Sequence, residues 1–259
     1  MADPGARQTH LLRRDGDLIT KTYRGWDRDQ HTREWDALTR LARYAPGLGP
    51  KPVSALLDAK PPSVTMTVIP GQPIVGAWTD EQIRLLAETL RRLWKIPTAG
   101  LTPIDMHESA YWRDLADKAV RPPNGVEQEA YDLAEEWIAG PDLDLVLDGQ
   151  QQQILGQGDP QPGNLLYDGE SIRLVDFEDA GASDVCFELA NFAEHLGTRG
   201  TGLDRVAEII DHDQSRYRQC RRLLASFWLF RLLPDPTGTR RNRTVKLPEQ
   251  AARLVDLFR

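Results

Sequence analysis

The chain has 259 residues, and its 32 Lys and Arg against 39 Asp and Glu give a formal net charge of −7 at pH 7. This acidic balance excludes a nucleic-acid binder whose affinity depends on a global basic field. With 40% hydrophobic and 27% charged residues, the composition is that of a globular protein. Since no run of the sequence approaches the ~20 apolar residues of a membrane-spanning helix, we expect neither nucleic acid nor a membrane as a partner.

The cysteines and the first residues bear on the cellular compartment. Cys186 and Cys220 are too few for a disulfide framework and lack the CxxC spacing of a zinc or redox site. Residues 1–14 carry an aspartate and three arginines without an apolar run, so they predict neither a signal peptide nor a transit peptide. We therefore expect a cytoplasmic protein.

The N-terminal part alternates short strands with one helix. Residues 9–23 predict a β-hairpin across an Asp15-Gly16 turn. Apolar residues at helical spacing and then alternating apolar runs predict a helix over 29–44 and strands over 53–57 and 64–69. The order up to residue 69 is therefore strand, strand, helix, strand, strand.

Helices dominate after Pro70-Gly71. Periodicity and capping residues predict helices over 79–96, 109–120, 126–139, 184–196, 203–210, 213–233 and 248–258. Short strands bounded by Gly and Asp are predicted over 153–155, 165–167 and 172–175. We expect an α+β protein with its boundary at residues 70–73, which separates a small β-rich lobe of residues 1–70 from a larger, mostly helical lobe of residues 71–259.

The segment that carries chemistry is Gly156-Gln-Gly-Asp159-Pro-Gln-Pro-Gly-Asn164, followed by Val175-Asp176-Phe-Glu178. An aspartate, an asparagine five residues later and a second aspartate beyond it suit phosphoryl transfer. That reaction needs one carboxylate near the acceptor hydroxyl and two oxygen ligands for Mg²⁺ across the nucleotide phosphates. A Gly-Asp-x₄-Asn run alone is also common in surface loops, so the second aspartate matters to the interpretation.

These motifs resemble those of the aminoglycoside phosphotransferase and choline kinase superfamily, relatives of the protein kinases, and the resemblance covers nearly the whole chain. It implies a two-lobed, protein-kinase-like fold. It also implies that Asp159 is the catalytic base or orients the acceptor hydroxyl, and that Asn164 and Asp176 hold Mg²⁺. Lys21 resembles the strand lysine that binds the phosphates of ATP, and Glu34 its ion-pair partner on the first helix.

The stretch of residues 64–73 is similar to the interlobe hinge of the superfamily. On that resemblance Met66 is the gatekeeper, and the backbones of Thr67 and Ile69 contact the adenine of the nucleotide. A lysine in an alternating strand or a glutamate on a helix surface is, by itself, most often solvated, so these assignments depend on the order and spacing of the whole set.

Two features depart from the superfamily pattern. Gln157 stands where relatives have a histidine that holds the catalytic loop, and a glutamine can take this role because its amide both donates and accepts. The first strand is preceded by no G-x-G-x-x-G motif, so any backbone cradle for phosphates is short and falls at residues 5–8.

Other charged residues leave alternatives open. Asp184 is predicted to be the N-cap of a helix, with Glu188 in the first turns of that helix. Glu178 and Asp179 could face either substrate or solvent. Residues 127–148 contain several Asp and Glu but no Lys or Arg. We favour a solvated helix face for this segment over a binding site for a polycationic acceptor. The bases of residues 214–246 could pair with that acidic helix or contact an anion, and His195 could be structural or contact substrate.

We interpret the chain as a small-molecule kinase that uses ATP and Mg²⁺ to phosphorylate a hydroxyl. The acceptor stays open between aminoglycosides or other antibiotics and metabolites such as choline, homoserine or sugars, and the oligomeric state is unknown. A nucleotide-binding pseudokinase would fit Gln157, and a non-enzymatic scaffold would fit if Lys21 pointed away from the cleft.

Overall fold

The structure, a computed structural model, describes residues 10–104, 109–148, 153–234 and 246–259. Its N-terminal part is a four-stranded antiparallel sheet in the order β1-β2-β4-β3. The strands are β1 (His10–Asp15), β2 (Leu18–Tyr23), β3 (Pro52–Leu56) and β4 (Ser63–Thr67). Gly16, with φ 58°, closes the predicted β1–β2 hairpin at the Asp-Gly turn.

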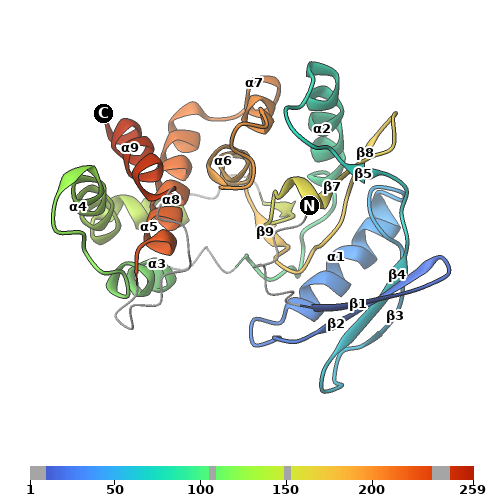
Figure 1. The fold of residues 1–259 in the computed structure, drawn as a ribbon. Helices are drawn as coiled ribbons and strands as arrows, with labels where there is room; N and C mark the ends of the chain where they lie inside the picture. Colours follow the sequence, from blue (N-terminus) through green and yellow to red (C-terminus); the bar gives the residue numbers. More distant parts are fainter. Residues whose placement is uncertain (1–9, 105–108, 149–152, 235–245) are drawn as a thin grey trace.

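Helix α1 (Gln30–Tyr44) connects β2 to β3 and lies between this sheet and the rest of the molecule (Figure 1). Its buried side chains include Glu34, Leu38 and Leu41, which recur every three or four residues and so share one face. The helix predicted over 29–44 is therefore confirmed. Its one buried carboxylate, Glu34, faces the junction between the two parts of the chain.

The rest of the described chain is mostly helical. Its helices are α2 (Asp80–Leu93), α3 (Ser109–Asp117), α4 (Gly125–Ala139), α5 (Pro141–Asp148), α6 (Val185–Glu194), α7 (Val206–Ile209), α8 (Gln214–Leu232) and α9 (Leu247–Phe258). Short strands form two small sheets, β5 (Gln72–Pro73) with β7 (Leu165–Tyr167) and β8 (Ile172–Leu174), and β6 (Ile154–Gly156) with β9 (Gly181–Ser183). None of the helices in the described ranges is long and apolar enough to cross a membrane.

The structure differs from the predicted elements in a few places. Helix α5 was not predicted, although Pro141 at its first position is a residue that favours a helix start. The helix expected over 203–210 is a 3₁₀ turn (Leu203–Arg205) followed by the short α7, and helix α2 ends at Leu93 rather than at Ile96. Strands β5 and β9 were not predicted, because Gln72-Pro73 and Gly181-Ala-Ser183 lack the β-branched and aromatic residues that favour a strand.

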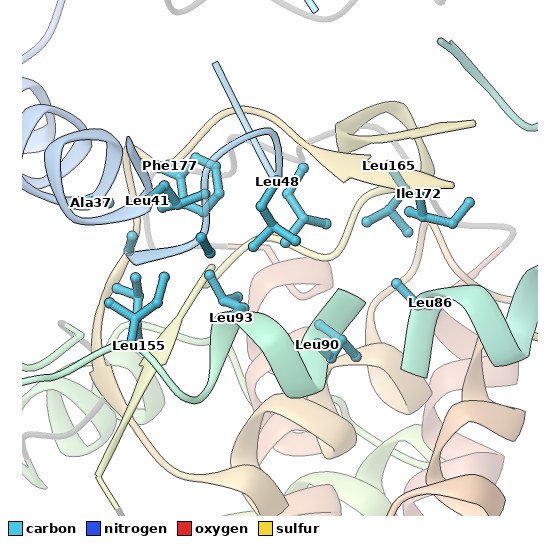
Figure 2. Close-up of a cluster of buried hydrophobic side chains, with 14 of the residues drawn as sticks. Ala37, Leu41, Leu48, Leu86, Leu90, Leu93, Leu155, Leu165, Ile172 and Phe177 are labelled. Carbon is cyan, nitrogen blue, oxygen red and sulfur yellow. The ribbon is translucent and has the colours of Figure 1, made fainter. Parts of the chain in front are cut away.

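The hydrophobic core that positions the site joins the two parts of the chain. Leu41 and Leu48 from the N-terminal part pack in one cluster with Leu93, Leu155 and Phe177 (Figure 2). Burial of each such side chain contributes about 1.5–3 kcal/mol. A second cluster lies among α3, α4, α5, α8 and α9 at the far end of the molecule.

Hydrogen bonds add to this junction. The backbone N–H of Leu174 in β8 donates to the carbonyl of Leu48, which follows α1. The Arg40 guanidinium of α1 donates to the carbonyls of Pro97 and Ala99 at 2.7 and 2.8 Å. Helix α1 is therefore anchored to the C-terminal part, so the carboxylate of Glu34 has a defined position opposite β8.

The acidic segment is a solvated helix face, as favoured from the sequence. Helix α4 buries one face, which includes Ala134, Trp137 and Ile138, while Glu129, Glu135 and Glu136 are exposed. The sequence left open whether the arginines at the start of α8 pair with acids of α4. The two that form ion pairs in the structure do not: Arg216 lies 2.7 Å from Asp184 and Arg221 lies 2.6 Å from Glu194. The reason is that α8 packs along α6, whose acids these are.

Candidate active site

A cleft of about 440 Å³ lies between the N-terminal sheet and strands β7 and β8. Seven of the residues singled out from the sequence line it: Lys21, Glu34, Met66, Thr67, Ile69, Asn164 and Asp176. Its remaining lining is largely apolar, with Leu12, Ile19, Leu166 and Val175 among the wall residues. Asp159 lies beside this set, in contact with Asn164.

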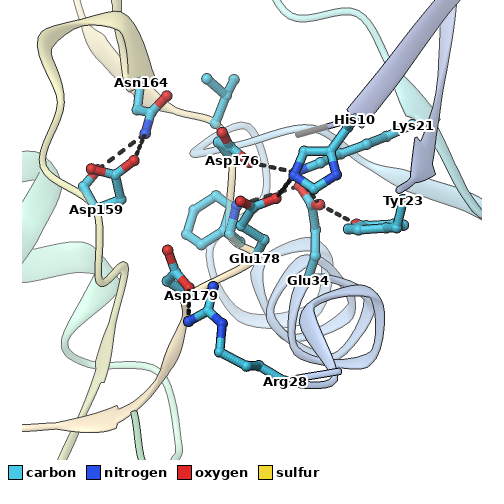
Figure 3. A network of polar contacts seen from close by, with 12 residues as sticks. His10, Lys21, Tyr23, Arg28, Glu34, Asp159, Asn164, Asp176, Glu178 and Asp179 are labelled. Atoms are coloured by element: carbon cyan, nitrogen blue, oxygen red, sulfur yellow. Dashed lines mark hydrogen bonds and ion pairs between the residues drawn. The ribbon is translucent and has the colours of Figure 1, made fainter. Parts of the chain in front are cut away.

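Lys21 projects from β2 into a group of three carboxylates (Figure 3). Its Nζ lies 2.8 Å from Glu34 Oε2 and 2.7 Å from Glu178 Oε2, and it also donates to Asp176. Burial of the ammonium opposes its charge, but the three carboxylates outweigh burial and raise the pKa of Lys21 above its usual value. The lysine is therefore cationic, and the ion pair with Glu34 forms.

Glu34 is held by two partners that motif reasoning did not identify. The Tyr23 hydroxyl donates to Oε2, and the backbone N–H of Phe177 donates to Oε1 at 3.3 Å. Burial raises the pKa of Glu34, an effect that Lys21 opposes. The carboxylate thus connects α1 to both β2 and the Asp176 segment.

Asp176 follows β8 with φ 62°, in the left-handed region that non-glycine residues rarely occupy. Its neighbour Phe177 is fully buried in the core cluster that joins the two parts of the chain, whereas the Asp176 side chain keeps 37% of its area exposed. Strained backbone of this kind persists only where the surroundings impose it, and it is most frequent at functional sites. The buried Phe177 anchors the turn that directs the Asp176 carboxylate into the cleft.

Gln157 connects the Asp159 loop to the Asp176 loop. Its Nε2 donates to the carbonyls of Val175 and Asp176 at 3.1 and 3.0 Å, while its Oε1 accepts from the backbone N–H of Asp159 at 3.1 Å. Both polar atoms of the side-chain amide are used, as its donor and acceptor chemistry allows. The glutamine therefore holds the loop in the way expected of a substitute for histidine.

Asp159 is partly buried and accepts a hydrogen bond from Asn164 Nδ2 at 3.1 Å (Figure 3). Burial raises the pKa of Asp159, the negative charges of Asp179 and Asp176 act in the same direction, and together they bring this pKa to about 7. A carboxyl with a pKa near neutrality exchanges a proton readily at physiological pH, which is the property of a general base.

Side chains of helix α6 hold the loop of residues 157–159 through hydrogen bonds. Glu188 lies in the first turn of α6, as predicted, and is also buried, where it accepts from the backbone N–H of Gln157 at 3.2 Å and from Ser183 Oγ at 2.9 Å. Asn191 Nδ2 donates to the carbonyl of Gly158 at 2.9 Å. Asp184 is the N-cap, as predicted, and accepts from the N–H of Phe187.

Gly158 allows its loop to pass close to the backbone of the turn at Asp179. Its φ is +83°, and a Cβ at this position would lie 2.4 Å from the carbonyl oxygen of Asp179. A side chain is excluded by both the dihedral angle and this contact. The Gly-Asp dipeptide of the motif therefore has a steric reason as well as a chemical one.

Glu178 and Asp179, left open by the sequence, both pair with cations. Glu178 contacts His10 and Lys21, and although burial opposes its charge these partners lower the pKa of Glu178 to about 2. Asp179 Oδ1 lies 3.0 Å from the Arg28 guanidinium. Sequence reasoning did not single out His10, whose contact with Glu178 joins β1 to the segment that follows β8.

Residues 5–8, where a phosphate cradle was expected, lie outside the described residues, as do residues 235–245 of the basic segment. The profile of the phosphotransferase enzyme family matches residues 5–224, a range that holds every candidate residue above. The chain belongs to this family. The enzyme class expected from the motifs, a small-molecule phosphotransferase, is thereby confirmed.

No curated protein matches this phosphotransferase, but solved structures share its fold. A choline/ethanolamine kinase family protein from Mesorhizobium loti has 16% identity and a TM-score of 0.67, covering 96% of this chain and 85% of that one. A choline kinase from Cryptosporidium parvum has 13% identity and a TM-score of 0.63 over 98% and 87% of the chains.

An aminoglycoside phosphotransferase from Streptomyces rimosus has 16% identity and a TM-score of 0.56, covering 86% of this chain and 94% of that one. At such identities the likeness is one of fold. It confirms the kinase-like α+β architecture, with a small antiparallel sheet region followed by a larger helical region.

Proposed function

We propose that this phosphotransferase transfers the γ-phosphate of ATP to a hydroxyl of a small molecule, with Mg²⁺ as its metal. The observation that carries the proposal is that Asn164, Asp176 and the Lys21–Glu34 ion pair line one cleft, with Asp159 beside it in contact with Asn164. These residue types supply a base, two oxygen ligands and a cation for phosphates.

The adenine has a suitable pocket between the two parts of the chain. Met66, Ile19, Leu166 and Val175 offer apolar surface to the faces and edge of a base. The N–H of Thr67 already donates to the carbonyl of Lys51. We therefore assign the adenine contacts to the carbonyl of Thr67 and to the backbone of Ile69, and we keep residues 70–73 as the proposed boundary between lobes 1–70 and 71–259.

Lys21 is suited to bind phosphate oxygens because it is cationic, buried and held by Glu34. Its contacts with Asp176 and Glu178 show that anions gather at its Nζ. The alternative of a non-enzymatic scaffold would fit only if Lys21 pointed away from the cleft, but Lys21 lines the cleft. The same carboxylates keep the lysine charged at any physiological pH.

The residues present fit a magnesium ion. Asn164 turns its amide nitrogen toward Asp159, which leaves its oxygen on the side away from Asp159 (Figure 3). Asn164 and Asp176 both line the cleft. The Asp176 carboxylate is part-exposed in the cleft. Oxygen ligands of this kind are those that Mg²⁺ prefers, and the bound ion would neutralise charge on the transferring phosphates.

Asp159 is the residue that would take the proton of the acceptor hydroxyl or orient that hydroxyl. Gln157 and Asn164 fix its backbone and its Oδ2, respectively. Its pKa of about 7 gives a base that is ionised in a large share of molecules at neutral pH. The intact set favours turnover over a pseudokinase.

The acceptor is proposed as a compact hydroxylated molecule. The test is Mg²⁺-dependent ATP consumption with aminoglycosides, choline, homoserine and sugars, each with wild type and Asp159→Asn. We expect one class to stimulate consumption in wild type and not in the variant. Binding of ATP without turnover on any acceptor would favour the pseudokinase, and a fully active Asp159→Asn would exclude the proposed base.

A further inference from the structure

His195 lies beside Asp159, although 36 positions separate them in the sequence. It is the C-cap of α6, where its backbone N–H donates to the carbonyl of Asn191. Its side chain is buried, and its Nε2 lies 3.6 Å from Asp159 Oδ1. We propose that His195 is a positioning residue that orients the Asp159 carboxylate through its Nε2–H, an inference that rests on the proposed role of Asp159.

The tautomer of the imidazole follows from its other nitrogen. The backbone N–H of Gly197 donates to Nδ1 at 3.0 Å, so Nδ1 carries the lone pair and the proton resides on Nε2. Burial lowers the pKa of His195, the nearby cations Arg199 and Lys246 act in the same direction, and together they bring this pKa to about 4. The contact is therefore a neutral N–H donor facing a carboxylate, not an ion pair.

The ring has little freedom to turn away from Asp159. Trp228 of α8 packs edge-on against it, with ring centroids 4.8 Å apart and planes at 85°. On the Gly197 side, even a Cβ would lie 3.1 Å from Nδ1 and Cε1. The preceding residue, Glu194, is fully buried and bound by Arg221 and Arg253. Elements α6, α8 and α9 thus fix the donor.

Asp159 would then have a donor on each oxygen. Asn164 Nδ2 donates to Oδ2 at 3.1 Å, and Gln161 Nε2 contacts the same oxygen at 3.4 Å. His195 faces Oδ1, the other oxygen. At 3.6 Å this contact is longer than a formed hydrogen bond, and catalytic hydrogen bonds that are long before substrates bind often tighten in the complex with substrate. With both oxygens engaged, the carboxylate would keep one orientation toward the acceptor.

The matched variants are His195→Phe, which keeps a ring against Trp228 but removes the donor, and His195→Gln, which returns an N–H. His212→Phe is the control, because His212 also packs edge-on against an aromatic ring, Tyr217, at 4.7 Å. We expect His195→Phe to lower kcat at least about tenfold, as loss of outer hydrogen-bond partners does elsewhere. KM for ATP and acceptor should stay within twofold, His195→Gln should recover part of kcat, and His212→Phe should match wild type.

A double-mutant cycle separates positioning from a general structural role. In the Asp159→Asn background His195→Phe should have no further effect on kcat, since no carboxylate remains to be oriented. An unchanged kcat in His195→Phe, an equal loss in both backgrounds, or a loss confined to acceptor KM would each overturn the inference. Full activity of Asp159→Asn itself would instead overturn the proposed function, so the two failures are distinguishable.

If His195→Phe fails to fold, Gly197→Ala tests the same contact. Gly197 has no left-handed backbone, so alanine is tolerated there conformationally, and its Cβ pushes the ring without changing its chemistry. We expect Gly197→Ala to retain nucleotide binding and to lower kcat severalfold. An unaltered kcat in a folded Gly197→Ala enzyme would overturn the inference.

Discussion

The side-chain amide of Gln157 donates to the backbone carbonyl of Asp176 at 3.0 Å. This contact couples the loop that carries the proposed base to the loop that carries the proposed metal ligand. The two loops follow strands β6 and β8, and the side chain of Gln157 connects them across 18 positions of sequence to Val175. The relative position of Asp159 and Asp176 therefore depends on residue 157.

Replacement of Gln157 should weaken both turnover and stability. Gln157→Leu leaves the carbonyls of Val175 and Asp176 without their donor, and a buried group left unsatisfied costs about 1–3 kcal/mol. We expect a lower free energy of unfolding in urea and a kcat reduced about tenfold or more. Gln157→His, which restores the residue typical of the superfamily, should keep most of both. Equal kcat in wild type and Gln157→Leu would contradict the coupling.

Asp159→Asn should preserve ATP binding and lower kcat about a hundredfold or more, the scale of a lost base. The sign of the pH dependence follows from the pKa of about 7: the carboxylate form increases as pH rises, so wild-type turnover should rise between pH 6 and 8. The residual turnover of the variant should lack this rise. Initial rates across that range, with ATP binding measured separately, check both statements.

The two proposed metal ligands can be tested by nucleotide binding, without a measurement of turnover. Asp176→Asn removes a charged oxygen ligand while keeping a residue that tolerates left-handed backbone. The extra thermal stabilisation that Mg²⁺ adds to ATP should therefore vanish in Asp176→Asn and fall only in part in Asn164→Ala. Melting temperatures with ATP, with and without Mg²⁺, provide the measurement, and an undiminished Mg²⁺ effect in Asp176→Asn would rule this residue out.

Glu188 should contribute to the pH dependence of stability. Burial raises its pKa from 4.5 to about 7, so between these values the folded protein binds more protons than the unfolded chain. The free energy of unfolding therefore falls as pH rises from 5 to 8, by an amount on the order of 3 kcal/mol from this group. Urea unfolding at both pH values should show a smaller fall in Glu188→Gln; an identical fall would mean that Glu188 is ionised at both.

Much of the fold was determined by local sequence. The Asp15-Gly16 turn predicts its hairpin because the dipeptide suits a tight turn between strands. Thr79 and Gln82 form the capping box that starts α2, so this boundary could be predicted from four residues. The core of the candidate site was also predictable, because Asp159, Asn164 and Asp176 belong to one short stretch whose spacing reflects the chemistry they suit.

Tertiary structure alone decided which residues complete the site. Tyr23 on Glu34, His10 on Glu178 and His195 beside Asp159 are contacts between distant elements, and nothing in the periodicity of one element reports its distance from another. Strands β5 and β9 likewise form because β5 pairs with β7 and β9 pairs with β6 through backbone hydrogen bonds. Burial of Glu188 depends on α6 packing beneath the loop. Local sequence sets turns, caps and amphipathic faces, whereas pKa values and site contacts follow from how those faces pack.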